Sequence, residues 1–170
     1  MIRIESIDRE IWIAEGKSSK GKEELLKIAS ELGTKKKTTI QILDAEKIFS
    51  IDQICSAFEK AARAIENKEN ASNSLATETM LYVSGCRQIQ EALNLIGLKN
   101  ESKAIVILSE VKLSDLNSTF AFEEDSSILS LGNKEIRSFG ITDLEISTVQ
   151  EGKRCDLVLE RVASVDIKKK

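Results

Sequence analysis

The residues best suited to chemistry in this chain lie in one short run, Ser84-Gly85-Cys86-Arg87-Gln88, between two predicted helices. Cys86 follows a helix break and precedes a cation, which is the kind of position at which enzymes hold a reactive thiolate. No general base stands close to Cys86 in the sequence. A packing role for this side chain is therefore favoured over a catalytic one.

Other catalytic and metal-binding patterns are missing from the sequence. The chain has no histidine, which removes the commonest general base and metal ligand, and with it the usual serine triad. The run Gly16-Lys17-Ser18 matches only the end of a phosphate-binding P-loop, because the upstream glycine is absent. The acidic residues Glu123 and Asp125 remain as a candidate pair for an enzyme acting on small molecules. We expect no cofactor and no metal ion.

The composition favours a soluble protein inside the cell. Cys55, Cys86 and Cys155 form no C-x-x-C pair, so free thiols in a reducing cytosol are expected rather than a zinc site or a disulfide framework. The net charge of -3 argues against a protein that coats nucleic acid by charge alone, although it permits a local basic patch. Residues 1–5 hold no long apolar run, and no stretch approaches the ~20 apolar residues of a membrane span. We expect a cytoplasmic protein.

Hydrophobic periodicity predicts most of the secondary structure. Alternating apolar residues predict a hairpin over 2–14 and a strand over 38–43, and the almost wholly apolar run 104–108 predicts a central strand. Apolar residues at helical spacing predict helices at about 18–33, 50–65, 75–83, 86–97, 128–140 (interrupted) and 155–165. The order predicts an α+β fold, with one domain over 1–167 in which a small mixed β-sheet packs with several α-helices. Residues 168–170 form a basic tail that we expect to be disordered.

The stretch from Leu75 to Leu98 is the most informative part of the sequence. Its pattern predicts a helix that contains an acidic residue, Glu78, and ends at a Ser-Gly pair. An Arg-Gln pair then leads into a second helix, which Gly97 ends. An alanine-rich helical run, 57–64, precedes it, and Phe139-Gly140-Ile141 comes later in the chain. This ordered series resembles the CGI-type family, also called TPRKB or PRPK-binding proteins. The members are small subunits of the archaeal and eukaryotic KEOPS (EKC) complex.

The resemblance covers roughly residues 2–165 and is firmest over 38–110. The chain departs from the family at Cys86, where threonine or another small residue is expected, and in the polar stretch 112–127. The resemblance implies a non-catalytic protein that binds the amino-terminal lobe of the complex's small atypical kinase. The complex as a whole makes threonylcarbamoyladenosine in tRNA, and archaeal members are understood to capture the single-stranded CCA 3′ end of tRNA.

The residues of this run include side chains and backbone groups that could capture a tRNA end. A helix that starts after Ser84 and Gly85 would point free backbone N–H groups outward towards a phosphate. Arg87 can grip phosphate with two donors or stack on a base, and Gln88 can bond a base edge. The structural alternative is that Ser84 caps this helix and Arg87 pairs with Glu91 one turn later.

The remaining tRNA candidates are Cys86, inside the same turn, and a basic rim made of Lys35, Lys36 and Lys37. A charged turn of this kind is more often simply solvated.

For the kinase interface we expect an apolar patch on a helical surface, because a stable docking site buries ~800 Å² on each partner. The candidates lie on two predicted helices: Leu93 and Ile96 on one, and Leu157, Val158, Arg161 and Val162 on the terminal one. Their alternative role is packing in the core.

Two other functions stay open from the sequence. One is a scaffold or homo-oligomeric subunit without nucleic-acid contact. The other is a small-molecule enzyme that uses Cys86 or the carboxylates of Glu123 and Asp125, which would require a reactive thiol or a pocket with a perturbed acid.

Overall fold

A five-stranded sheet forms the middle layer of the structure, a computed structural model that describes residues 1–6, 8–102, 104–130 and 136–167. The strands are β1 (Ile2–Ser6), β2 (Arg9–Ser18), β3 (Ile40–Asp44), β4 (Ile105–Ser109) and β5 (Phe122–Glu124). Their order is β1-β2-β4-β3, and β5 pairs with the far end of β2. Every described strand pair is antiparallel. The α+β domain is thus confirmed, but the sheet is antiparallel rather than mixed.

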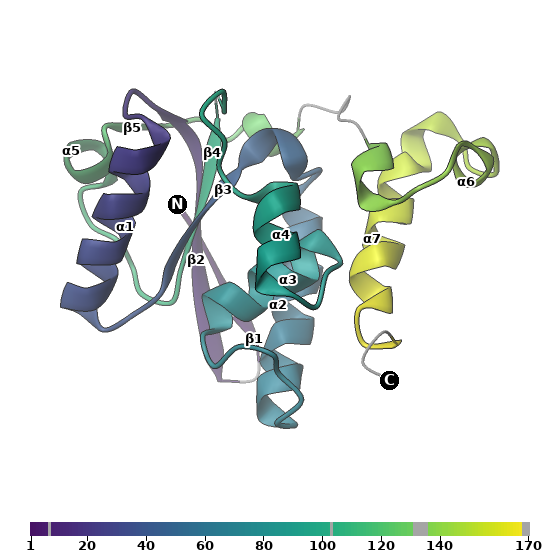
Figure 1. Cartoon of the computed structure of the whole chain (residues 1–170), viewed down its shortest axis with the longest axis horizontal. Helices are drawn as coiled ribbons and strands as arrows, with labels where there is room; N and C mark the ends of the chain where they lie inside the picture. Colours follow the sequence, from purple (N-terminus) through teal and green to yellow (C-terminus); the bar gives the residue numbers. More distant parts are fainter. Residues whose placement is uncertain (7, 103, 131–135, 168–170) are drawn as a thin grey trace.

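Helices cover both faces of this sheet (Figure 1). They are α1 (Lys22–Lys36), α2 (Ile51–Glu66), α3 (Leu75–Ser84), α4 (Ile89–Ile96), α5 (Leu116–Phe120), α6 (Asp143–Ser147) and α7 (Arg154–Ser164). The described residues also form four short 3-10 helices: η1 (Ala45–Lys47), η2 (Ile128–Ser130), η3 (Ile136–Phe139) and η4 (Glu151–Lys153). Figure 1 shows α1 and α5 on one side of the sheet and α2, α3 and α4 on the other, with α7 and α6 forming a further layer beyond α2 and α3.

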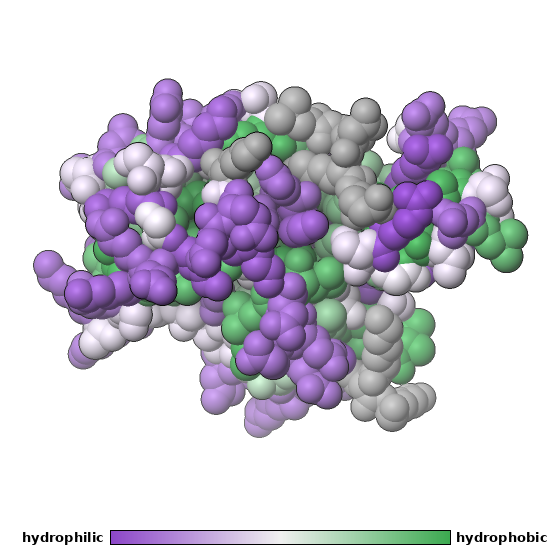
Figure 2. Space-filling model, turned by 45° about the horizontal axis from the view of Figure 1, so that its top comes forward, coloured by the Kyte–Doolittle hydropathy of each residue, from purple (hydrophilic) through white to green (hydrophobic). Residues whose placement is uncertain are grey.

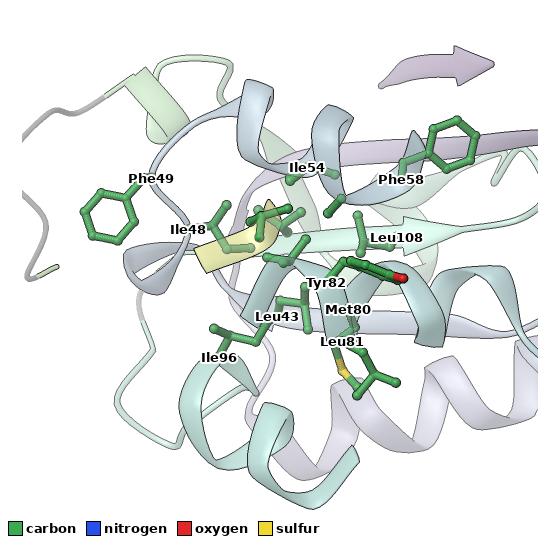
Figure 3. Close-up of a cluster of buried hydrophobic side chains, with 14 of the residues drawn as sticks. Leu43, Ile48, Phe49, Ile54, Phe58, Met80, Leu81, Tyr82, Ile96 and Leu108 are labelled. Carbon is green, nitrogen blue, oxygen red and sulfur yellow. The ribbon is translucent and has the colours of Figure 1, made fainter. Parts of the chain in front are cut away.

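The two faces of the sheet carry separate apolar cores. Along β4, Val106 and Leu108 belong to the larger core with α2, α3, α4 and α7, whereas Ile105 and Ile107 belong to the smaller core under α1. This alternation follows from the two-residue period of a strand. Figure 3 shows side chains from β3, α2, α3, α4 and β4 meeting in the larger core. Each fully buried side chain of this size contributes roughly 1.5–3 kcal/mol to stability.

The structure differs from the expected elements at two places along the chain. The first helix was placed from Ser18, but Ser18 is the last residue of β2, and α1 begins only at Lys22 with Gly21 as its N-cap. Pairing with β5 holds residues 16–18 in the sheet. The acidic stretch 123–125, for which no strand was predicted, supplies part of β5, although its glutamates are exposed.

Two predictions fall partly or wholly outside the described residues. Of the interrupted helix over 128–140, the described parts are the short turns η2 and η3, and residues 131–135 lie outside the description. The tail 168–170 also lies outside it, so the domain limits 1–167 stay a prediction.

Candidate functional site

The buried helix α3 positions the run of residues 84–88. All ten of its residues are buried, and its closest packing partner is α2. The Gln53 side chain of α2 donates to the Val83 carbonyl at 2.8 Å and accepts from the Phe49 N–H at 2.8 Å. Gln53 therefore fixes the end of α3 to the start of α2, immediately before the candidate turn.

The turn that follows α3 closes that helix rather than opening the next one. Gly85 adopts the left-handed conformation at φ 69°, which glycine tolerates best. Its N–H donates to the Tyr82 carbonyl at 3.0 Å, and the Cys86 N–H donates to the Leu81 carbonyl at 3.1 Å. α4 starts only at Ile89, with Gln88 as its N-cap. The expected outward-pointing N–H groups after Ser84 and Gly85 are therefore used inside α3, and this part of the prediction is wrong.

Ser84 and Gly85 are also withdrawn from the surface. Both are buried, and the Ser84 hydroxyl donates back to the Leu81 carbonyl at 2.8 Å, so it does not cap α4. A Cβ atom added to Gly85 would lie 3.5 Å from the Cβ of Arg161 on α7. The chain emerges gradually after this point: Cys86 and Arg87 are partly exposed and Gln88 is exposed. Only the second half of the run can meet a large ligand directly.

Arg87 is held by an acid that the sequence did not identify as its partner. Its Nη1 lies 3.6 Å from Oε1 of Glu78, whose side chain is 0% exposed, and its Nη2 donates to the Glu69 carbonyl at 3.4 Å. The other Glu78 oxygen accepts from the Ala71 N–H at 3.0 Å and the Ser72 N–H at 2.8 Å. The expected pairing of Arg87 with Glu91 is replaced by a clasp between Arg87, Glu78 and the loop before α3.

Cys86 has the surroundings of a packing residue. Its side chain packs against the larger core, and its Sγ donates to the Ser84 carbonyl at 3.5 Å. No described ion pair or hydrogen bond joins this sulfur to an acidic or basic side chain. These contacts support the non-catalytic interpretation of the thiol.

Of the two candidate acids, Asp125 is hydrogen-bonded within its own turn. Asp125 accepts hydrogen bonds from the Ser127 hydroxyl at 2.6 Å and the Ser127 N–H at 3.1 Å, and these bonds hold the pKa of Asp125 below its usual value. Lys17 lies 3.8 Å from the same carboxylate. Glu123 is exposed on β5 opposite Lys17. The bonds that Asp125 makes within its own turn suit a surface role better than acid catalysis.

The three lysines end α1, and the last of them, Lys37, lies beside the loop that leads into α3. Lys35 and Lys36 form the last turn of α1, where cations complement the helix dipole, and Lys37 is its left-handed C-cap. All three are exposed. Lys37 lines a pocket of about 380 Å³ together with Asn73, Ser74 and Glu110, among others. The loop before α3 therefore runs from the Lys37 pocket to the Arg87 clasp, so the structure brings these two sets of cations to the same segment.

Four of the six kinase-interface candidates belong to the core. Ile96 on α4 and three residues of α7 are 0–4% exposed, so they cannot form an exposed patch in this conformation: Leu157, Val158 and Val162. Their helical spacing marked the buried face, as the packing alternative anticipated. Leu93 is 37% exposed and remains available.

Arg161, the sixth candidate, ties α7 to α6. One of its Nη atoms donates to Glu145 at 2.5 Å and to the Gly140 carbonyl at 3.2 Å. Glu145 also accepts from the Thr142 N–H at 2.7 Å in a capping box, and these bonds lower the pKa of Glu145 to about 2, the Thr142 backbone bond having the largest effect. Arg161 is therefore a structural link, although its side chain keeps part of its surface exposed.

The sequence analysis missed Ile89 as a surface residue. It is 44% exposed and lies one helical turn before Leu93 on α4. Ala92 and Ile96 form the buried side of this helix. The sequence pattern could not separate Ile89 from the core, because residues 89, 92, 93 and 96 follow the i, i+3, i+4, i+7 spacing of a single apolar stripe. The structure buries Ala92 and Ile96 and leaves the Ile89 and Leu93 edge of that stripe exposed.

A second exposed apolar residue lies on α6, at the end of the molecule. Leu144 is 76% exposed there. Figure 2 shows mostly hydrophilic residues on the face in view, with hydrophobic colour at the projecting end that carries α6.

No helix in the described part of the chain is both long and apolar enough to cross a membrane. The described residues also contain no group of three or more acidic, cysteine or histidine side chains that would suit a metal ion.

Comparison with known proteins gives two matches. Residues 18–149 match the model of a family described as "Kinase binding protein CGI-121". The "Regulatory protein Cgi121" of Methanocaldococcus jannaschii is 26% identical over 130 residues, which cover 76% of this chain and 84% of that relative. The matched region contains the α3–α4 series and the loop before it.

Proposed function

Because the chain belongs to the family of the kinase-binding protein CGI-121, we propose that it is a non-catalytic regulatory subunit that docks onto a protein kinase in the cytoplasm. The observation that carries this proposal is the family match over residues 18–149. The site is consistent with it, since the Cys86 thiol packs in the turn and Asp125 is bonded within its own turn. No chemical step has to be assigned to the chain itself.

The outward face of α4 is the docking surface that we assign to the kinase. Ile89 and Leu93 stand one turn apart on the edge of the α4 apolar stripe that the core leaves exposed. Two side chains cannot supply a whole interface, but a few apolar anchors commonly carry most of the binding energy. The surface lies directly after the Arg87 clasp, so the clasp sets the angle at which α4 leaves the turn.

Aspartate substitutions test this surface. We expect Ile89→Asp combined with Leu93→Asp to weaken binding to the small atypical kinase by at least ~100-fold, because both anchors would present charges to an apolar contact. Isothermal titration calorimetry measures the effect. Leu26→Asp is a matched control, since Leu26 is 43% exposed but lies on α1, across the sheet. The assignment would be contradicted if the α4 variant kept its affinity for the kinase, or if the Leu26→Asp control lost as much affinity as the α4 variant.

We further propose that this kinase belongs to the KEOPS complex, and that the chain contributes tRNA binding through the single-stranded CCA 3′ end. The resemblance of the α3–α4 series to the CGI-type family supports this, together with the arrangement of basic side chains. Lys35, Lys36 and Lys37 are exposed at the end of α1, where Lys37 lies beside one end of the loop before α3, and Gln88 is exposed just beyond Arg87. Phosphate contacts would come from the lysines and base contacts from Gln88.

The tRNA part is tested by binding measurements at one fixed salt concentration. We expect trimming of the CCA end to reduce affinity at least ~10-fold, and replacement of Lys35, Lys36 and Lys37 by alanine to weaken binding and flatten its salt dependence. Lys27→Ala is the control, because Lys27 is exposed on α1 but already faces Glu31 at 3.9 Å. Equal affinity for intact and trimmed tRNA would refute CCA capture while leaving kinase docking intact.

A further inference from the structure

Strand β1 leaves one edge of the sheet open. It pairs with β2 alone, and no other described strand lies along its second edge. Such an edge presents unpaired backbone N–H and C=O groups and is a template for another strand unless something blocks it. The chain contains no proline, and the five residues of β1 form regular pairs with β2. Of the usual blocking devices, only charged side chains and a short strand remain.

The charges of β1 are arranged to attract a copy of the same strand. The sequence Ile2-Arg3-Ile4-Glu5-Ser6 carries opposite charges on either side of Ile4. In an antiparallel pair of identical strands, a register centred on Ile4 places Arg3 opposite Glu5 of the second copy, twice, and Ile4 opposite itself. Opposite charges that face each other across strands stabilise the pair.

The alternative registers are unfavourable. A two-fold axis through the sheet keeps the same face of both copies on the same side, so the register must be centred on a residue. Centring on Arg3 places two guanidinium groups opposite each other, and centring on Glu5 does the same with two carboxylates. The charges on β1 therefore favour one register of pairing between two copies of the strand and do not prevent pairing altogether.

We propose that the chain self-associates through this edge, with β1 of one copy pairing antiparallel with β1 of a second copy in the register centred on Ile4. The result is a continuous sheet across a two-fold axis. One short strand pair buries much less than the ~800 Å² per partner of a stable interface, so the dimer is weak and its population rises with protein concentration.

Arg3 belongs to a cluster of charged and aromatic side chains on the face of β1 and β2 that the contact would extend. Its Nε donates to Glu10 at 2.6 Å, and its guanidinium lies 5.7 Å from the centre of the Trp12 ring. Lys112 lies 5.4 Å from the same ring. Arg3 also contacts Glu5 of its own strand, so pairing turns one charge pair into a four-charge cluster beside Trp12. Trp12 is the single tryptophan of the chain, which makes its fluorescence a local reporter.

Charge exchange across the edge tests the proposal. Sedimentation equilibrium of the full chain over a wide concentration range should show a monomer–dimer equilibrium, with Trp12 fluorescence changing over the same range. Arg3→Glu and Glu5→Arg should each raise the dimer dissociation constant about tenfold, because two attractive pairs become repulsive. The double variant R3E/E5R restores opposite charges and should return the constant to within about threefold of the original.

The control is Lys112→Glu, which reverses the other cation beside Trp12 but leaves β1 unchanged. It should shift the fluorescence without changing the dimer constant. Circular dichroism checks that each variant is folded. If the chain is monomeric at every concentration, the proposal is overturned. The same holds if the chain stays monomeric by itself and the edge pairs only with a strand of another protein. A dimer that R3E/E5R fails to restore places the interface elsewhere and also overturns it.

Discussion

Glu78→Ala is expected to lower the free energy of unfolding by roughly 3–4 kcal/mol, because it removes a buried anion on which three other groups depend. Glu78 is fully buried in α3. One carboxylate oxygen accepts from the N–H groups of Ala71 and Ser72, and the other faces Arg87. The substitution leaves both N–H groups without their acceptor and leaves a partly buried guanidinium without its counter-charge.

Urea unfolding followed by circular dichroism measures this loss, and a double-mutant cycle assigns it. Glu78→Ala and Arg87→Ala should each destabilise strongly, whereas the double variant should lose much less than the sum, because no unpaired charge then remains. Glu91→Ala is the control, since Glu91 is an exposed acid on α4. A Glu78→Ala effect no larger than that of Glu91→Ala would show that the clasp does not hold the loop.

The Glu78–Arg87 clasp also explains why part of the candidate site could not be read from the sequence. The helical patterns around Leu75 and Ile89 located α3 and α4, and the glycine between them marked the break. The partner of Arg87 depends on the path of the chain after Gly85. Because Gly85 and Cys86 bond back onto Tyr82 and Leu81, the chain reverses beside α3 and returns Arg87 to its first turns.

The prediction that the α7 residues form an exposed docking patch was wrong for a different reason. On α7, Leu157, Val158 and Val162 repeat at helical spacing whether they meet the core or a partner protein. The sequence contains no sign of which surface covers them. The same holds on α4, where Ile89, Ala92, Leu93 and Ile96 form one apolar stripe. Only the structure shows that Ala92 and Ile96 are buried while Ile89 and Leu93 stay exposed.

The sheet was predictable where strands are continuous and apolar, and less so at its edges. Residues 105–109 form the central strand expected from their composition. The end of β2 was not predicted, because Gly16, Lys17 and Ser18 lack an apolar pattern: the predicted hairpin stopped at residue 14, and Ser18 was assigned to the following helix. Their strand conformation depends on β5, which lies more than 100 residues later and carries acidic side chains. Long-range pairing of this kind overrides local propensity.

The dependence of β2 on β5 makes Gly16→Ala a strongly destabilising substitution. A Cβ atom at Gly16 would lie 2.1 Å from the carbonyl oxygen of Glu123 and 2.6 Å from Cζ of Phe122. The first contact is with backbone, so it is relieved only if β5 moves away from β2. Movement of β5 exposes the buried Phe122 ring and weakens the Asp125 N–H bond to the Glu15 carbonyl. We expect a loss of roughly 3 kcal/mol, at the upper end for overpacking.

Urea unfolding measures the loss, and limited proteolysis should show faster cleavage around β5 under native conditions. Gly21→Ala is the matched control, because nothing lies within 4 Å of a Cβ atom there and φ is -74°. The free energy of unfolding of that variant should stay within about 1 kcal/mol of that of the original chain. If Gly16→Ala were as mild as Gly21→Ala, β5 would not be packed on β2 as described. The close approach of two backbones, rather than phosphate binding, is therefore the physical reason for glycine in Gly16-Lys17-Ser18.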